Sequence, residues 1–361
     1  MNITFLGSDK FSNFALKGLL RVKPHIKTLK VYTSNTHKGA NPVQLFAREN
    51  GLEVYSPFGK CKETNRESFR SLVINSLDSN SKSVLVACSF GFMVPGFVID
   101  SFESNCFVIH PSLLPKYRGS SPISAALLNN DAESGVSIVE MSKHKYDAGA
   151  ILMQEKLTIK PEWVYSDLYD ALGEMSDSVV EKFILDFDAY KKAKQIQPEN
   201  AASAKKLVHS DGHVRFAEMT AAEINNRYRA YKGSTLKTIY CELWPEKRRF
   251  FITSCKPHQA SLDSIIKSKE PFSDELIPVG SIVSGFGPSK GNLLVKCAEG
   301  WLEVSGGYFE DKGNLNFLQT KQILIKGKGS EILKLLSLQA KTTSEPDATL
   351  MTEIANLKRF I

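Results

Sequence analysis

Short apolar segments alternate with amphipathic ones over roughly the first half of the chain. Asn2–Leu6 and Val84–Cys88 have the length and composition of strands, and Val84–Cys88 is apolar throughout, which is typical of the centre of a parallel sheet. Phe11–Leu20 places apolar residues near helical spacing, and Ser166–Tyr190 predicts one long helix. This alternation predicts an α/β domain over residues 1–190, with an open sheet and helices on both faces.

The pattern changes after a polar stretch at residues 191–204, which we interpret as a linker. Thr220–Glu223 matches a capping box and predicts a helix through Tyr231. Short strand candidates separated by turn residues then predict a small all-β barrel over residues 205–340, followed by a tail at 341–361. These candidates are Lys237–Leu243, Phe250–Thr253, Gly280–Val283, Leu293–Cys297, Trp301–Val304 and Gln322–Ile325.

Length and composition fit two globular domains. The chain has 361 residues, of which 42% are apolar and 24% charged, so a chain disordered throughout is excluded. No apolar run approaches the ~20 residues that a membrane-spanning helix needs. The six cysteines form no C-x-x-C pair, which argues against a zinc ribbon and favours a reducing compartment. We therefore expect a protein with no membrane segment and no metal.

Positive charge gathers in the second half of the chain. Residues 201–361 hold 23 Lys and Arg against 17 Asp and Glu, whereas residues 1–200 hold 23 against 22. This surplus is compatible with an ordinary solvated surface or with a face that binds a polyanion. Composition alone leaves both interpretations open.

A histidine and an aspartate fall at predicted strand ends. His110 closes the apolar strand Phe107–His110, and Asp147 lies between two later strand candidates. Such a pair can act as an acid and base, because the carboxylate orients the imidazole and the imidazole moves a proton at neutral pH. A purely structural pair is the alternative. No G-x-G-x-x-G or P-loop motif is present, which disfavours a dinucleotide or nucleoside triphosphate site.

The surroundings of these two residues resemble the folate-dependent formyltransferase family. The shared features are His110, the run Ser112–Pro115, Arg118-Gly119 and Asp147–Gly149. More weakly, Ser210–Phe216, the helix after it and Leu318-Gln319 resemble the C-terminal domain of the methionyl-tRNA branch of that family. The resemblance implies a Rossmann-like domain followed by an OB-like β-barrel. It also implies formyl transfer from 10-formyltetrahydrofolate, as co-substrate, to the α-amino group of initiator methionyl-tRNA.

The resemblance also implies roles for individual residues. His110 and Asp147 correspond to the catalytic pair. Ser112, Leu113, Leu114 and Pro115 correspond to the folate-binding loop, which is expected to act mainly through backbone groups and apolar contacts. Phe90, Phe92 and Met93 could line the pterin site, although plain core packing explains them equally well.

One position departs from the family pattern. The family has asparagine two residues before the histidine, where this chain has Val108. Strand periodicity points both side chains to the same face, so Val108 removes a donor that could polarise the formyl carbonyl. Losing one such donor typically costs a factor of ~10²–10³ in rate. Asn105 is expected to face the other way. We expect a slowed or compensated enzyme, with a tRNA- or protein-binding module that has lost catalysis as the alternative.

Several further expectations concern the partner and the location. The loop 35–41 carries a single lysine, so the grip on tRNA is expected to depend on the second half. Formyltransferases acting on a phosphoribosyl amine or a nucleotide-linked amino sugar are rival members. The opening run Phe5–Ser12 resembles mitochondrial members of the family more than bacterial ones, and the Lys/Asn/Ser-rich composition fits a eukaryotic gene. Together they favour the mitochondrial matrix, although no leader is visible, and we expect a monomer. The candidate tRNA-binding cations are Lys205, Lys206, Arg227, Arg229, Lys232, Lys247, Arg248, Arg249, Lys321, Lys326 and Lys328.

Overall fold

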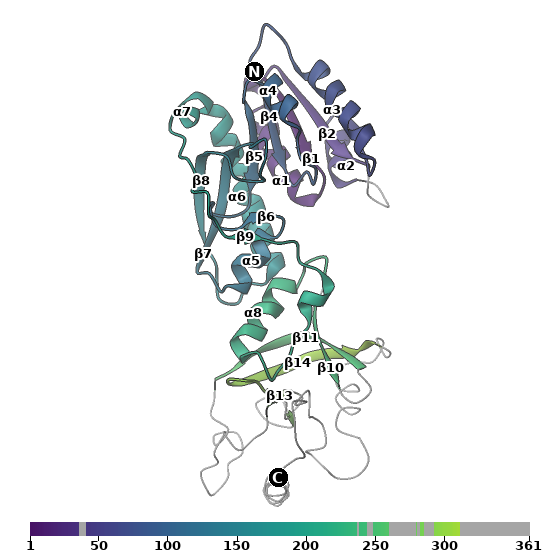
Figure 1. Cartoon of the computed structure of the whole chain (residues 1–361), viewed down its shortest axis with the longest axis vertical. Helices are drawn as coiled ribbons and strands as arrows, with labels where there is room; N and C mark the ends of the chain where they lie inside the picture. Colours follow the sequence, from purple (N-terminus) through teal and green to yellow (C-terminus); the bar gives the residue numbers. More distant parts are fainter. Residues whose placement is uncertain are drawn as a thin grey trace, which may run out of the picture. The chain divides into compact units, whose positions relative to one another are not determined.

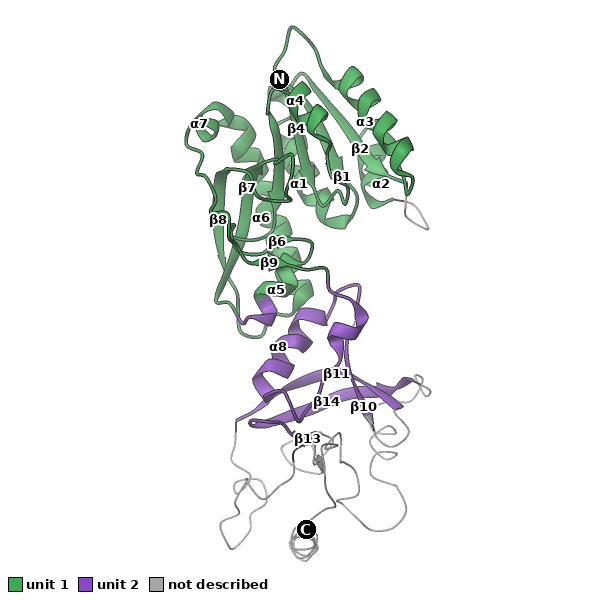
Figure 2. Ribbon diagram, in the orientation of Figure 1, with its two compact units in different colours: residues 1–126, 131–206 green, residues 127–130, 207–361 purple. Residues whose placement is uncertain are grey.

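A computed structural model describes residues 1–35, 41–236, 238–243, 248–259, 279, 282–284 and 292–310. The chain divides into two compact units (Figures 1 and 2). The first unit comprises residues 1–126 and 131–206, and the second comprises 127–130 and 207–361.

The first unit is built on a seven-stranded sheet with the order β3-β2-β1-β4-β5-β7-β8. The first five strands in that order run parallel, whereas β7 and β8 are antiparallel additions beyond β5. Every residue of β1 is buried, so both faces are covered at the centre of the sheet. The predicted Rossmann-like α/β domain is confirmed. The strands are β1 (Asn2–Gly7), β2 (Thr28–Ser34), β3 (Glu53–Phe58), β4 (Ser83–Cys88), β5 (Cys106–His110), β7 (Glu133–Glu140) and β8 (Ile151–Thr158).

Seven α-helices among the described residues begin in this unit. They are α1 (Lys10–Arg21), α2 (Pro42–Glu49), α3 (Lys62–Ser76), α4 (Gly96–Ser101), α5 (Pro122–Leu128), α6 (Tyr165–Leu185) and α7 (Phe187–Lys192). Of these, α5 ends in residues 127 and 128 of the second unit. The single helix predicted over 166–190 is wrong, because the chain leaves helical geometry at Asp186, where φ is −111° and ψ is 31°. This break lets the Phe187 ring enter the core, with its centroid 5.5 Å from that of Phe107.

The second unit contains a separate antiparallel sheet. Its order is β10-β11-β14-β13-β12, with α8 (Ala221–Tyr231) beside it. Thr220 caps α8 through a reciprocal pair of hydrogen bonds with Glu223, as the capping box predicts. Five antiparallel strands match the number in an OB-like module. The strands are β10 (Ile239–Leu243), β11 (Arg248–His258), β12 (Ile282–Ser284), β13 (Leu293–Lys296) and β14 (Trp301–Phe309). The candidate Gln322–Ile325 and the tail lie outside the described residues.

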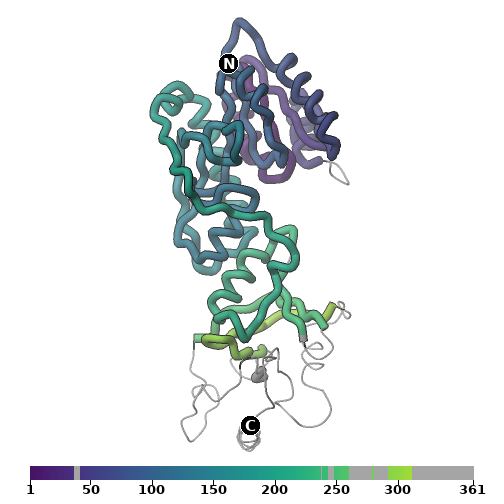
Figure 3. The backbone as a smooth tube through the Cα atoms, viewed as in Figure 1, coloured from purple at the N-terminus to yellow at the C-terminus, as the bar shows by residue number. Residues whose placement is uncertain are grey.

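A short two-stranded element brings distant segments of the first unit together. In it, β6 (Arg118–Gly119) pairs in parallel with β9 (Ser203–Ala204). Figure 3 shows the backbone leaving α7 and running back past the β7–β8 end of the unit toward this pairing. The stretch 191–204 therefore includes residues that are hydrogen-bonded to the loop following β5.

Candidate active site

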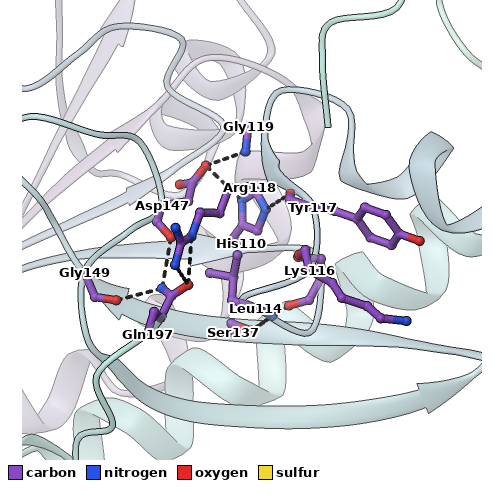
Figure 4. A network of polar contacts seen from close by, with 11 residues as sticks. His110, Leu114, Lys116, Tyr117, Arg118, Gly119, Ser137, Asp147, Gly149 and Gln197 are labelled. Carbon is purple, nitrogen blue, oxygen red and sulfur yellow. Dashed lines mark hydrogen bonds and ion pairs between the residues drawn. The ribbon is translucent and has the colours of Figure 1, made fainter. Parts of the chain in front are cut away.

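The structure brings His110 and Asp147 together (Figure 4). His110 is the last residue of β5, and Asp147 lies in the connection between β7 and β8. The distance from His110 Nδ1 to Asp147 Oδ2 is 3.7 Å, and the two side chains are 6% and 10% exposed. Both side chains can bind and release a proton, and both are nearly buried, so the pair is suited to proton transfer.

The second ring nitrogen of His110 is also engaged. Nε2 lies 2.9 Å from the carbonyl oxygen of Tyr117. A carbonyl only accepts, so Nε2 carries the hydrogen in this contact, and Nδ1 is the nitrogen that faces Asp147. The loop after β5 thus fixes both the orientation and the tautomer of the imidazole.

Backbone geometry explains why the aspartate is followed by glycine two positions later. Asp147 has φ of +53°, a left-handed conformation that is uncommon for residues other than glycine. Its Oδ2 accepts a hydrogen bond of 3.0 Å from the N–H of Gly119. A Cβ at Gly149 would lie 1.9 Å from the carbonyl oxygen of Glu140, so no other residue fits there without moving the strands.

The loop Ser112–Pro115 is anchored by buried polar groups from the neighbouring strands. The hydroxyl of Ser137, on β7, donates to the Ser112 carbonyl at 2.6 Å and accepts from the Leu114 N–H at 3.1 Å. Gln154, on β8, donates to the Leu114 carbonyl at 2.8 Å. Both backbone groups of Leu114 are therefore used inside the protein. Leu113 and Pro115 stay half-buried.

Sequence analysis did not single out Ser137 or Gln154. Ser137 is a polar residue inside the apolar strand segment Val136–Val139, and it is fully buried. A lone hydroxyl in an apolar strand must find partners there, which is the signal that could have identified it. The hydroxyl of Ser112 is also internal, since it donates to the Lys116 carbonyl at 2.7 Å.

Val108 lies on the same face of β5 as His110. It is half-buried and packs against Leu114, Val139 and Ile151. Asn105 does not replace the missing amide, because its Oδ1 accepts a hydrogen bond from Lys191 on α7. The position where the resemblance leads us to expect asparagine is thus apolar, with no amide supplied by Asn105.

The segment 89–95 alternates between buried and exposed residues. The Phe90 ring is 5% exposed and lies 5.0 Å from Phe58, measured between centroids, and Phe92 packs against the same cluster. Met93 is 37% exposed. Core packing therefore accounts for Phe90, whereas Met93 remains available to a ligand.

The predicted cationic residues divide into accessible and internal groups. Lys205, Lys206 and Lys232 are exposed. Arg229 is only 5% exposed and donates to Asn130 Oδ1 at 3.0 Å, so its assignment to a tRNA-binding surface is wrong. Arg227 is hydrogen-bonded to the carbonyls of Asp211 and His213.

Two arginines of β11 are half-buried. The Arg248 guanidinium lies 4.2 Å from the Phe309 ring centroid, and Arg249 is within ion-pair distance of Glu242 and Glu310. Lys247, Lys321, Lys326, Lys328 and most of the loop 35–41 lie outside the described residues.

Among the residues that the structure describes, no helix is both long enough and apolar enough to cross a membrane. The same residues contain no group of three or more His, Cys, Asp or Glu side chains arranged to hold a metal ion.

Comparison with known proteins identifies the class to which this fold and site belong. Residues 1–184 match the formyl transferase family, and residues 206–322 match the formyl transferase C-terminal domain. The chain belongs to the formyl transferase family, whose members transfer formyl groups.

The curated relatives have a more specific name. A methionyl-tRNA formyltransferase of Parvibaculum lavamentivorans is 26% identical over 85% of this chain and 91% of its own length. One from Ehrlichia ruminantium is 30% identical over 71% of this chain and 84% of its own length.

Solved structures with a similar fold include two that contain folate compounds. An N-formyltransferase from Helicobacter canadensis, crystallised with folinic acid and dTDP-3-aminofucose, superposes with a TM-score of 0.59 at 16% identity. The match covers 85% of this chain and 100% of that one. HypX from Aquifex aeolicus, in complex with tetrahydrofolic acid, gives a TM-score of 0.53 at 13% identity, over 91% of this chain and 48% of that one.

Proposed function

We propose that this protein transfers the formyl group of 10-formyltetrahydrofolate to the α-amino group of methionyl-tRNA. The observation that carries the proposal is the His110–Asp147 pair at the end of β5, inside a chain of the formyl transferase family. The names of the curated relatives favour methionyl-tRNA as the acceptor. The folate compounds bound in the similar solved structures favour a folate donor.

The geometry supports a direct transfer between two nitrogens. The amine lone pair attacks the formyl carbon, so that a C–N bond forms and the carbonyl electrons move to oxygen. The Asp147 carboxylate, 3.7 Å from His110 Nδ1, takes the proton that the amine loses. The C=O bond then re-forms as the bond from carbon to N10 of the folate breaks, and the same proton is delivered to N10, directly or through His110 Nδ1. Atoms and charge balance without a metal or a redox partner.

The loop Ser112–Pro115 would shape the folate site. The buried bonds that Ser137 and Gln154 make to this loop fix its path. Leu113 and Pro115 are the members with exposed surface, so they are the ones that could touch the folate, whereas Ser112 and Leu114 support them from inside. Stable positioning of such a loop lowers the entropy lost on binding.

Binding of the tRNA would depend on cationic side chains in the second half of the chain. Lys205, Lys206 and Lys232 are the accessible candidates among the described residues. Contacts between lysine and phosphate release counterions, so the affinity for tRNA should fall steeply with salt.

A nucleotide-linked amino sugar is the second candidate acceptor. It is favoured by the match to the Helicobacter canadensis enzyme, which covers that enzyme completely. The comparisons give no support to a binding module without catalysis.

We also propose the mitochondrial matrix as the location, which imaging of the full chain with a C-terminal fluorescent tag would test.

The acceptor is tested by supplying formyl-labelled 10-formyltetrahydrofolate with one amine at a time. Methionyl-tRNA, free methionine and dTDP-3-aminofucose are compared at equal concentration, and the labelled product is quantified. The proposal expects kcat/KM for methionyl-tRNA to exceed that for the other two by at least a factor of ten. Faster formylation of the amino sugar would establish the second candidate instead.

A further inference from the structure

We infer that Gln197 is a positioning residue for Asp147, and this inference rests on the proposed function of the His110–Asp147 pair. Gln197 lies in the polar stretch after α7, and it is only 7% exposed. Its amide nitrogen donates to the Asp147 carbonyl at 2.9 Å and to the Gly149 carbonyl at 2.7 Å. One side chain thus bridges the backbone on both sides of the turn that presents the carboxylate.

The amide oxygen of Gln197 also makes two hydrogen bonds. It accepts from Nε and Nη2 of Arg118 at 3.0 and 2.8 Å (Figure 4). The same guanidinium also donates to the carbonyls of Pro198 and Glu199. Both N–H groups and both lone pairs of the Gln197 amide are therefore used, which leaves this side chain a single orientation.

The segment that carries Gln197 is itself fixed at both ends. Gln195 and Ile151 exchange two backbone hydrogen bonds of 2.7 Å, which tie the segment to the start of β8. Further along, the Ala202 carbonyl accepts from the N–H groups of Tyr117 and Arg118. The Gln197 side chain thus links the loop after β5 to the connection between β7 and β8 through hydrogen bonds.

Gly119 and Gln197 together hold Asp147 from two sides, and we call these contacts the clamp. The peptide N–H of Gly119 holds the carboxylate, and the Gln197 amide holds the carbonyls at the turn. The clamp holds Asp147 in its left-handed conformation, which is unfavourable for residues with a Cβ. Without Gln197 the turn can relax, and the carboxylate no longer keeps its position beside His110 Nδ1.

The test uses Gln197→Glu in the full-length protein. A glutamate keeps the acceptor for Arg118 and has the same shape, but it cannot donate to the two carbonyls. The control is Gln195→Ala, since the Gln195 side chain is exposed and its backbone makes the bonds. We expect Gln197→Glu to lower kcat for formyl transfer by roughly 10- to 100-fold with the KM for the formyl donor within about twofold, because misplacing a reacting group by 1 Å can cost 10²-fold.

A double variant separates positioning from general stability. If Gln197 acts only through Asp147, Gln197→Glu will not slow Asp147→Asn any further. Losses that multiply in the double variant, an unchanged kcat in Gln197→Glu, or an equal loss in Gln195→Ala would each overturn the inference. If Gln197→Glu does not fold, Gln197→Asn is used with the same expectations, since its shorter side chain cannot reach both carbonyls.

Hydrogen exchange provides a readout that is independent of the acceptor. Amide exchange over residues 142–150 should rise in Gln197→Glu and stay at the wild-type level in Gln195→Ala. Unchanged exchange in both variants would overturn the clamp even if activity fell. Conversely, an Asp147→Asn protein that is fully active would refute the proposed role of the pair, while this exchange experiment would still decide whether the clamp exists.

Discussion

Replacing Val108 with asparagine places an amide at the position where the resemblance to the family implies one. Val108 shares its strand face with His110 and is half-buried against Leu114, Val139 and Ile151. An amide placed there can donate to the formyl oxygen as negative charge develops on it. One preorganised donor is worth a factor of about 10²–10³ in kcat, or about 2.7–4 kcal/mol.

The same change removes apolar contacts. Full burial of a valine side chain contributes about 1.5–3 kcal/mol, so a half-buried one loses roughly 1 kcal/mol when it becomes polar. For a unit of about 200 residues, a loss of this size lowers Tm by about 2–4 °C. The added donor lowers the activation free energy, whereas the lost packing lowers only the free energy of unfolding. We therefore expect Val108→Asn to have a lower Tm and a higher kcat.

The assay is steady-state formylation of methionyl-tRNA together with thermal unfolding, with Val108→Ala as the matched control. Alanine removes the same packing without adding a donor, so its Tm should fall and its kcat should not rise. An increase in kcat of at least tenfold for Val108→Asn alone supports the reasoning. If Val108→Asn folds and its kcat stays within twofold of the wild type, Val108 is not the site of a lost donor.

Three further predictions follow from local geometry. Gly149→Ala places a Cβ 1.9 Å from the Glu140 carbonyl oxygen, so both Tm and kcat should fall, and unchanged values of both would contradict the packing described. Cys61 is the one exposed cysteine, and burial raises the pKa of the other five, so a thiol reagent should titrate one group in the native protein and six after unfolding. Lys27 holds the pKa of Asp78 down at about 2, so Asp78 stabilises the fold above its ordinary pKa and this contribution disappears as the pH falls through 2. Asp78→Asn should therefore lower Tm slightly at pH 7, and a Tm difference that persists at pH 2 would refute the assignment.

The sequence predicted those features that depend on local patterns. The capping box at Thr220 marked the start of α8, because helix ends are decided by side chains within one turn. The sequence placed His110 and Asp147 next to predicted strands, but β7 runs antiparallel to β5 and ends beside Phe107, so the contact between the two residues depends on the path of the connection between β7 and β8.

The remaining features depend on segments that meet only in the folded chain. Gln197 stands in a polar stretch with no periodicity, and its partners Arg118 and Asp147 lie 79 and 50 residues away. The burial of Arg229 could not be predicted from the sequence either, because its partner Asn130 is 99 residues away. The break at Asp186 was missed since it reflects packing of Phe187 in the core rather than a helix-breaking residue.

The most direct test of the central claim is the single-turnover rate of formyl transfer with the wild type and with Asp147→Asn. Saturating enzyme is mixed with labelled 10-formyltetrahydrofolate and methionyl-tRNA, so that chemistry is observed without product release. Asparagine fills the same space but cannot take up the proton, so the account predicts that the rate falls by about 10²–10⁴-fold. A single-turnover rate for Asp147→Asn within threefold of the wild type, in a protein with unchanged Tm, would contradict the claim that this pair moves the proton.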